Sequence, residues 1–300
     1  MENRKERIRL ALICMAFGTI GAVAHFIALP SATIVFYRAF LGGAFLIVNL
    51  FLQGKKIDSI SIKNNLILLT FLGLCLGFNW VFQFESFKAS TVAIGTVCYN
   101  TMPIFLIIFS AIIFKEKIAL KTIICIIVAL IGVILVSNVV TTGIRSNQVV
   151  GCIYGIIGAI FYATAVTLNR KLKNVTAYDR LIYQFFISII MMAFYIAFLQ
   201  KGTFLFPSDI SRKDLIIGIV ALLLLGLFHT GFCYVHYFNA ISVLPARDVA
   251  IFTFIDPVVA LFLSYFALKE EMTALQFVGA MLIIISMFAN EIVGKSEENT

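Results

Sequence analysis

The chain consists of long apolar stretches separated by short polar and basic connections. A helix needs about 20 apolar residues to cross a hydrocarbon core of about 30 Å. Because these stretches are continuously apolar and do not alternate with polar positions, they favour helices over the strands of a membrane barrel. The pattern predicts ten membrane-spanning helices, at residues 8–28, 31–52, 66–85, 90–114, 119–138, 150–169, 178–200, 214–238, 245–268 and 273–293.

The composition agrees with a protein that lies in a lipid bilayer. Of 300 residues, 61% are hydrophobic and 13% are charged, and the mean hydropathy is +1.04. Soluble domains average about 45–50% apolar and about 25% charged residues. We therefore exclude a soluble enzyme, and also a nucleic-acid-binding protein despite the net charge of +8. The fold class we predict is an all-α polytopic membrane protein.

Motifs of the common enzyme classes do not occur in the sequence. There is no His-Glu-x-x-His zinc motif, no Gly-x-Ser-x-Gly nucleophile turn and no Walker-type glycine loop. The three histidines have no Cys or carboxylate at a spacing that would complete a zinc site. We expect no enzyme activity, no metal and no other cofactor. Because the spans leave no room for a nucleotide-binding domain, we expect transport to use a gradient.

The distribution of Lys and Arg predicts the orientation in the membrane. These residues are concentrated in the N-terminal segment, in the connections that follow even-numbered spans and in the C-terminal segment. Basic residues mark the cytoplasmic side of a membrane protein. Both termini are therefore predicted to be cytoplasmic, in a multi-pass protein of the cytoplasmic (inner) membrane.

The sequence repeats itself with an offset of 154 residues. Residues Gly77–Phe84 align with Gly231–Phe238. Without a gap, three further matches follow: Pro103 with Pro257, Ser110 with Ser264, and Lys115-Glu116 with Lys269-Glu270. We infer a first five-helix repeat over 1–145 and a second over 146–300. Because five is odd, the second repeat enters the membrane from the opposite side, and such inverted repeats are typical of secondary transporters.

These paired anchors resemble those of the EamA branch of the drug/metabolite transporter superfamily. The resemblance rests on Pro103 with Lys115-Glu116, on Pro257 with Lys269-Glu270, and on Tyr37-Arg38 in the second span. It implies export of amino acids or other small metabolites and a central cavity between the halves. In the second repeat Gln184 replaces the Arg and Asp256 precedes the proline, so the resemblance does not define the substrate.

Two charged residues lie inside predicted spans. Insertion scales give a cost of roughly 2.5–3.5 kcal/mol for such a group. Arg38 lies about 11 Å from the outer surface and Asp256 about 14 Å, from a rise of about 1.5 Å per residue. In one interpretation they form a structural ion pair or find separate partners near a water-filled cavity. In the other, Arg38 holds a substrate carboxylate, for which its planar fork is suited, and Asp256 attracts an amino group.

Asp256 has a further candidate role as a proton carrier. A carboxylate in apolar surroundings can load and release protons near neutrality. It directly precedes Pro257, where a helix bend frees backbone groups. Protons are therefore a candidate coupling partner.

Five aromatic residues lie at mid-depth, away from the interfacial belts where Trp and Tyr usually collect. They are Trp80, Tyr99, Tyr234, Tyr37 and Phe78, of which the first three are candidates for the site. Trp80 and Tyr234 occupy equivalent repeat positions, so the pseudo-symmetry predicts that both lie towards the centre. Their rings can stack on an aromatic ligand or hold a cation. The alternative is ordinary core packing.

Three polar residues complete the candidate site. The amides of Asn79 and Asn100 need partners when they are buried, and His229 can line a cavity or relay protons. Hydrogen bonds between helices would explain all three equally. The candidate substrate-binding residues are Arg38, Asn79, Trp80, Tyr99, Asn100, His229, Tyr234 and Asp256.

Prolines and glycines indicate where helices bend and where they approach closely. Pro103 and Pro257 predict bends in equivalent helices, which are candidate gates for alternating access. Gly-x-x-x-Gly motifs at 73–77 and 151–155 predict close helix packing.

The sequence thus predicts a secondary or facilitative transporter of small polar metabolites that works by alternating access. Export of an amino acid or a related metabolite is the favoured activity. The alternatives are an uptake transporter for a metabolite or organic cation, and a membrane sensor or binding protein that transports nothing. The predicted partners are a small-molecule substrate, the lipid bilayer and possible protons; a monomer and a homodimer are both compatible with the sequence.

Overall fold

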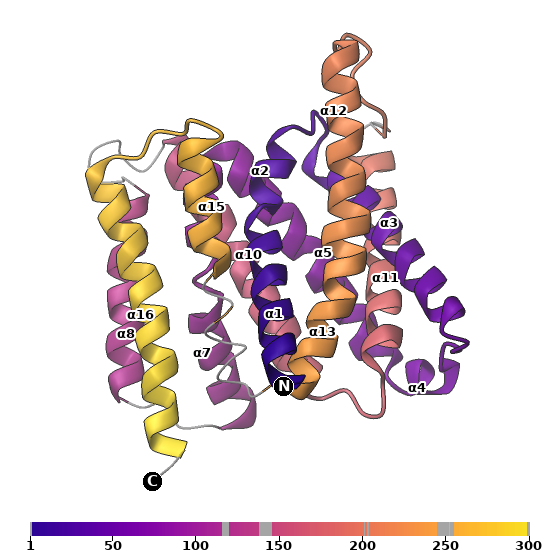
Figure 1. The fold of residues 1–300 in the computed structure, drawn as a ribbon, viewed down its shortest axis with the longest axis horizontal. Coiled ribbons are helices and arrows are strands. Elements are labelled where there is room, and N and C mark those ends of the chain that lie inside the picture. Colours follow the sequence, from indigo (N-terminus) through magenta and orange to yellow (C-terminus); the bar gives the residue numbers. More distant parts are fainter. Residues whose placement is uncertain are drawn as a thin grey trace.

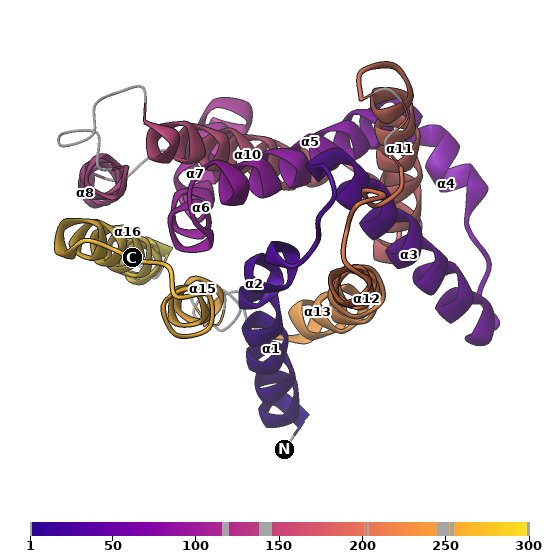
Figure 2. The same cartoon turned by 90° about the horizontal axis from the view of Figure 1, so that it is seen from above.

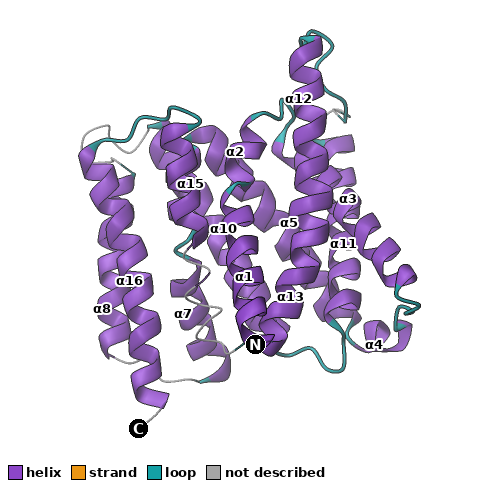
Figure 3. Cartoon of the chain, in the orientation of Figure 1, coloured by secondary structure: helices purple, strands orange, loops and turns teal. Residues whose placement is uncertain are grey.

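The backbone of an apolar segment in hydrocarbon must bond to itself, and the computed structural model of the protein accordingly folds into helices. The structure describes residues 2–115, 120–137, 146–200, 202, 204–244, 252 and 255–298. Within these ranges every regular element is a helix (Figure 3), in agreement with the predicted all-α class.

The first part of the chain begins with a span that is interrupted at Thr19 and ends with the helix before residue 137. Its helices are α1 (Glu2–Gly18), α2 (Ile20–His25), α3 (Ser31–Leu52), α4 (Ser59–Asn64), α5 (Leu66–Ala89), α6 (Val92–Tyr99), α7 (Met102–Phe114) and α8 (Leu120–Val136). Figure 1 follows them along the chain.

The second part contains an element that the hydrophobic pattern does not predict. Its helices are α10 (Asn147–Asn169), α11 (Ala177–Phe198), α12 (Arg212–Leu223), the π-helix η1 (Leu224–Phe232), α13 (Cys233–Val243), α15 (Ile255–Phe266) and α16 (Ala274–Glu298). Because η1 joins α12 directly to α13, one long span contains two changes of helical geometry.

Hydroxyl side chains begin three helices of the second part. Ser146, Thr176 and Ser211 are the N-cap residues of α10, α11 and α12, and each accepts a hydrogen bond from a backbone N–H of the first turn. Such caps satisfy donors that would otherwise be unpaired at a helix start.

Seven helical segments of the described chain are long and apolar enough to cross a membrane, at Arg4–His25, Ser31–Leu52, Leu66–Ala89, Val92–Phe114, Asn147–Asn169, Ala177–Phe198 and Arg212–Tyr237. Three shorter apolar helices lie at Ile123–Val136, Ile255–Phe266 and Ala274–Ser286. Each of the ten predicted spans overlaps one of these segments. The number of helices that actually cross the membrane stays a prediction, since these three are shorter than a full span.

Close backbone approaches hold the helices together. A Cβ added at Gly73 would lie 2.7 Å from the Cβ of Ile187 on α11, and one added at Gly155 would lie 2.9 Å from the Cβ of Cys98 on α6. Small residues allow such approaches in a membrane, where van der Waals packing replaces the hydrophobic driving force. The close packing predicted for both Gly-x-x-x-Gly motifs is therefore confirmed.

The last helices of the two parts, α8 and α16, pack closely against each other. Figure 2 shows α8 beside α16 at one edge of the bundle, with α3 and α11 at the opposite edge. A Cβ at Gly132 would lie 2.7 Å from the carbonyl oxygen of Gly279, and the reverse distance is also 2.7 Å. Backbone thus meets backbone at this crossing.

Candidate substrate-binding site

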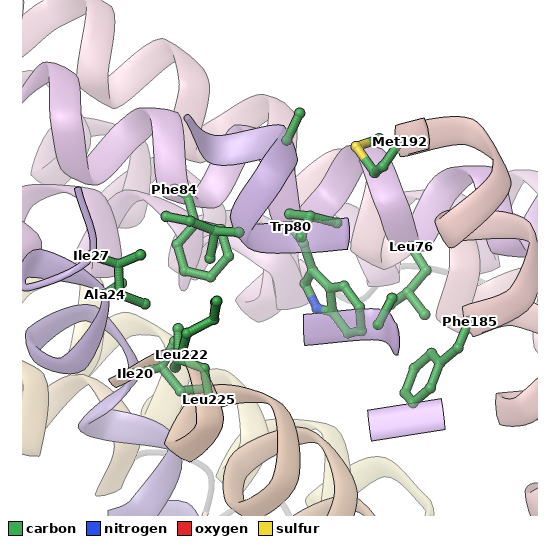
Figure 4. Packing of buried hydrophobic residues seen from close by; sticks show 14 of the residues in the cluster. Ile20, Ala24, Ile27, Leu76, Trp80, Phe84, Phe185, Met192, Leu222 and Leu225 are labelled. Carbon is green, nitrogen blue, oxygen red and sulfur yellow. The ribbon is translucent and has the colours of Figure 1, made fainter. Parts of the chain in front are cut away.

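The largest buried cluster of the described chain lies between α2, α3, α5, α11 and the start of the η1 segment. Figure 4 shows part of it, with Trp80 and Phe84 projecting from the same side of α5 and Phe185 nearby on α11. The ring centroids of Trp80 and Phe185 are 5.4 Å apart. An apolar interior of this kind has no need of a charge, yet it contains one.

That charge is Arg38 of α3, whose side chain is 1% exposed. Its Nε donates to the Thr230 hydroxyl at 2.7 Å, and its guanidinium carbon lies 4.3 Å from the centroid of the Trp80 ring. The Nη1 atom is buried and has no hydrogen-bond partner among the described residues. Buried polar atoms are nearly always paired, and a charged donor has the most to lose. The unpaired donor therefore indicates where the acceptor group of a ligand could bind.

Asp256 does not supply that acceptor. Among the described side chains, no nitrogen–oxygen distance of 4.0 Å or less joins Arg38 to Asp256, so they form no direct ion pair. Tyr99 lies within electrostatic range of both groups. Tyr162, whose ring centroid is 6.1 Å from that of Tyr99, is also within range of Asp256. Tyr99 thus lies near both charges.

The two repeat-related aromatic residues meet at the centre, as their positions predict. The ring centroids of Trp80 and Tyr234 are 6.4 Å apart and nearly perpendicular. Tyr234 also packs against Phe17 at 5.7 Å and against Phe185 at 6.1 Å. Edge-to-face pairs at these distances are favourable. They make a rigid aromatic wall beside the Arg38 guanidinium.

Asn79 connects three helices beside this wall. Its Nδ2 donates to the Tyr99 hydroxyl at 3.1 Å and to the Gly158 carbonyl at 2.9 Å. Its Oδ1 is buried without a hydrogen-bond partner. Asn79 therefore fixes Tyr99 and still presents an unused acceptor, so it combines the structural interpretation with the binding one.

Asn100 and His229 use their polar atoms within the protein. Asn100 Nδ2 donates to the Thr96 carbonyl one turn earlier, at 2.8 Å. His229 contacts the Leu224 carbonyl through Nδ1 at 3.0 Å and the Thr19 hydroxyl through Nε2 at 2.8 Å. These bonds favour the structural alternative for both residues, and we leave both out of the central group.

The two candidate gates lie near changes in the backbone. Helix α6 ends at Tyr99 and α7 begins at Met102, so the predicted bend lies just before Pro103. Pro257 is buried near the start of α15, and the two residues directly before that helix are outside the described part of the chain. A gating role for either proline stays a prediction.

Sequence reasoning missed several residues that the structure places at this centre. Thr230 bonds Arg38, and Phe17 and Phe185 complete the aromatic wall. Phe17 and Phe185 are hidden among 30 phenylalanines, so nothing distinguishes them in the sequence. Thr230 is a threonine within an apolar span, and nothing in the sequence distinguishes it either.

The fold and the site define a polytopic helical membrane protein with a buried, incompletely paired cation between its two halves. The chain belongs to the EamA-like transporter family, whose model matches residues 8–138 and 149–290. This confirms the predicted EamA resemblance, and the two matched segments confirm a two-repeat architecture. Membership in this family makes the protein a membrane transporter.

Individual relatives carry the same broad description. The chain is 26% identical over 281 residues to "Uncharacterized transporter YxxF" of Bacillus subtilis, covering 93% of this chain and 87% of that protein. It is 28% identical over 262 residues to an "Uncharacterized transporter" of Clostridium kluyveri, covering 84% and 80%. A solved structure titled "Crystal structure of protein" shares the fold, with a TM-score of 0.66 at 15% identity over 97% of this chain and 99% of that one.

Proposed function

We propose that the protein is a secondary transporter that exports a small zwitterionic metabolite, an amino acid or a close relative, by alternating access. The observation that carries the proposal is the unpaired Nη1 of Arg38 in an otherwise closed, aromatic environment. A buried guanidinium in the membrane costs free energy. A ligand that accepts a hydrogen bond from the unpaired Nη1 would offset part of this cost.

The geometry favours a carboxylate as the ligand of Arg38. A guanidinium presents its donors in a planar fork that matches a carboxylate. Its Nε is already bonded to Thr230 and its flat face lies against Trp80, so the unpaired edge is what remains for a ligand. An anion bound at this edge would neutralise the buried charge.

Asp256 supplies the complementary charge for an amino group. Asp256 and Arg38 both lie within electrostatic range of Tyr99, and no direct ion pair joins them in the described structure. A zwitterion can satisfy both groups at once, whereas a simple carboxylic acid satisfies only Arg38. A proton on Asp256 would compete with the amino group, which provides a route to proton coupling. Transport driven by a gradient follows from this scheme, with both termini in the cytoplasm.

The first experiment is a thermal-stability panel on the detergent-purified protein. The panel pairs each amino acid with its carboxamide and with its decarboxylated amine. A ligand at ten times its Kd adds about 1.4 kcal/mol to the free energy of unfolding. We predict that one or more amino acids stabilise the wild type and that neither of the matched compounds does.

The matched variants are Arg38→Gln and, as a control, Arg212→Gln at the exposed start of α12. Stabilisation by amino acids should vanish in Arg38→Gln and persist in Arg212→Gln. Stabilisation by the amines alone would overturn the carboxylate assignment and favour an organic cation held by Asp256 and the aromatic wall. Binding without flux in liposomes would favour a sensor.

A further inference from the structure

The π-helix η1 is not required by the repeat architecture. Residues Gly231–Phe238 align with Gly77–Phe84, and the latter lie in α5, which is α-helical from Leu66 to Ala89. In the second repeat the nine residues Leu224–Phe232 are wound as a π-helix instead. Such wide turns are rare and often lie at functional sites. The local difference therefore needs a local reason.

Thr230 provides that reason. It is a completely buried residue of η1, and its hydroxyl both donates and accepts a hydrogen bond. The hydroxyl donates to the Leu225 carbonyl, five residues back, at 2.7 Å. Its single proton is thereby used, so the oxygen can only accept the 2.7 Å hydrogen bond from Arg38 Nε. The direction of both hydrogen bonds is fixed.

The contact between α3 and η1 depends on a glycine. A Cβ added at Gly42 would lie 2.6 Å from the Thr230 methyl carbon and 3.4 Å from the Gly226 carbonyl oxygen. Gly42 lies one turn beyond Arg38 on α3, so the same close approach that seats the methyl group brings the hydroxyl to the guanidinium.

His229 holds the same turn from the other side. Its Nδ1 lies 3.0 Å from the Leu224 carbonyl oxygen, within hydrogen-bond distance. Its Nε2 bonds to the hydroxyl of Thr19, at the break between α1 and α2. Adjacent residues of η1 thus tie it to two different helices, which fixes where Thr230 stands.

We propose that Thr230 is the positioning residue of the substrate site: its hydroxyl holds Arg38 by Nε, flat against Trp80, so that Nη1 remains available to a carboxylate. This inference rests on the proposed function for the identity of the ligand. The orientation of Arg38 by Thr230 does not depend on it and can be tested separately.

The protein contains its own reporter of that orientation. Trp80 is the single tryptophan of the chain, and its ring lies 4.3 Å from the guanidinium carbon. The emission of this tryptophan therefore reports on Arg38 without any ligand. Thr230→Val removes the hydroxyl and keeps the shape of the side chain. Thr230→Ala also removes the hydroxyl, with a smaller side chain. Thr230→Ser keeps the hydroxyl. Arg38→Gln gives the spectrum of an indole without its cation.

Thr167 provides the matched control. It is a completely buried threonine of α10 whose hydroxyl has no hydrogen-bond partner in the part of the chain that the structure describes. Thr167→Val therefore removes a buried hydroxyl without touching Arg38. We expect the emission maximum and intensity to move towards those of Arg38→Gln in Thr230→Val and Thr230→Ala, and to stay at the wild-type values in Thr230→Ser and Thr167→Val.

The second arm measures binding of the amino acids that stabilise the wild type. Loss of a bond to a charged group should raise their Kd by about tenfold to a hundredfold in Thr230→Val, and Thr230→Ser should restore it. Affinity for a decarboxylated amine that binds should change by less than about twofold. If no amino acid binds the wild type, the proposed function fails and the emission arm still decides the role of Thr230. The proposal would be overturned if Thr230→Val and Thr230→Ala both kept the emission of the wild type and, where an amino acid binds, also its Kd.

Discussion

At the scale of residues, the membrane makes each buried polar atom informative. Arg38 keeps an unpaired Nη1 and Asn79 keeps an unpaired Oδ1, whereas Asn100 and His229 use their polar atoms inside the protein. In hydrocarbon there is no water to form a hydrogen bond with an unpaired polar group. The unpaired atoms therefore favour Arg38 and Asn79 over Asn100 and His229 as candidate ligands.

This scale also shows what the sequence could predict of the site. Arg38 and Asp256 are visible because a charge in an apolar segment is rare. Trp80 and Tyr234 are visible because the repeat pairs them, and the structure does bring them together. Thr230 is not visible, since a threonine in an apolar helix costs little and its bond to Arg38 joins residues 192 apart in the chain. Which polar group finds which partner is decided by packing.

Asp256 gives a prediction about coupling. If it carries the proton, export from liposomes should accelerate when the compartment that receives the substrate is acidic, because a proton then enters as the substrate leaves. Asp256→Asn cannot exchange a proton, so its rate should be independent of the pH gradient. The measurement is flux at equal pH and under a gradient.

Asp209→Asn, in an exposed loop, is the control for that experiment and should keep the dependence of the wild type. If the gradient still accelerates transport by Asp256→Asn, the coupling group lies elsewhere.

At the scale of elements, local geometry departs from the hydrophobic pattern where helices change course. The pattern predicts one continuous helix over 214–238 and another over 90–114, yet the first contains η1 and the second is interrupted between α6 and α7. Length and hydropathy define where a segment crosses the membrane. They contain no information on whether a turn is wound as α or π, which depends on contacts such as those of Thr230.

The N-terminus of α6 is capped by the side chain of Glu270, which is far away in the sequence. The Glu270 carboxylate accepts hydrogen bonds from the backbone N–H groups of Val92 at 2.9 Å and Ala93 at 3.3 Å, and it also accepts one from the Ser264 hydroxyl. A carboxylate is favoured at a helix N-terminus, where the first N–H groups are unpaired. Because Glu270 follows α15, this contact joins the second half to the first.

We predict that Glu270→Gln lowers the free energy of unfolding by about 0.5–2 kcal/mol, since an amide caps a helix start less well than a carboxylate. Thermal unfolding of the purified protein measures the change. The neighbouring Glu271→Gln is the control, because Glu271 is exposed and should change stability very little. Equal effects of the two substitutions would contradict the capping role.

At the scale of the whole molecule, the important contacts join the two halves. Arg38 of the first half bonds Thr230 of the second, Trp80 meets Tyr234, and Gly132 meets Gly279. The repeat predicts only the second of these contacts, because Trp80 and Tyr234 occupy equivalent positions. The number of crossing helices and the inverted orientation of the second half stay predictions, because they depend on the position of the membrane.

The most direct test of the central claim is counterflow of a labelled amino acid in proteoliposomes. The amino acid is one that stabilises the wild type, and the samples contain wild type, Arg38→Gln or Arg212→Gln. We predict that wild type and Arg212→Gln exchange the label and that Arg38→Gln does not, although it is inserted and folded. Undiminished exchange by Arg38→Gln would contradict the claim that this buried arginine binds the substrate.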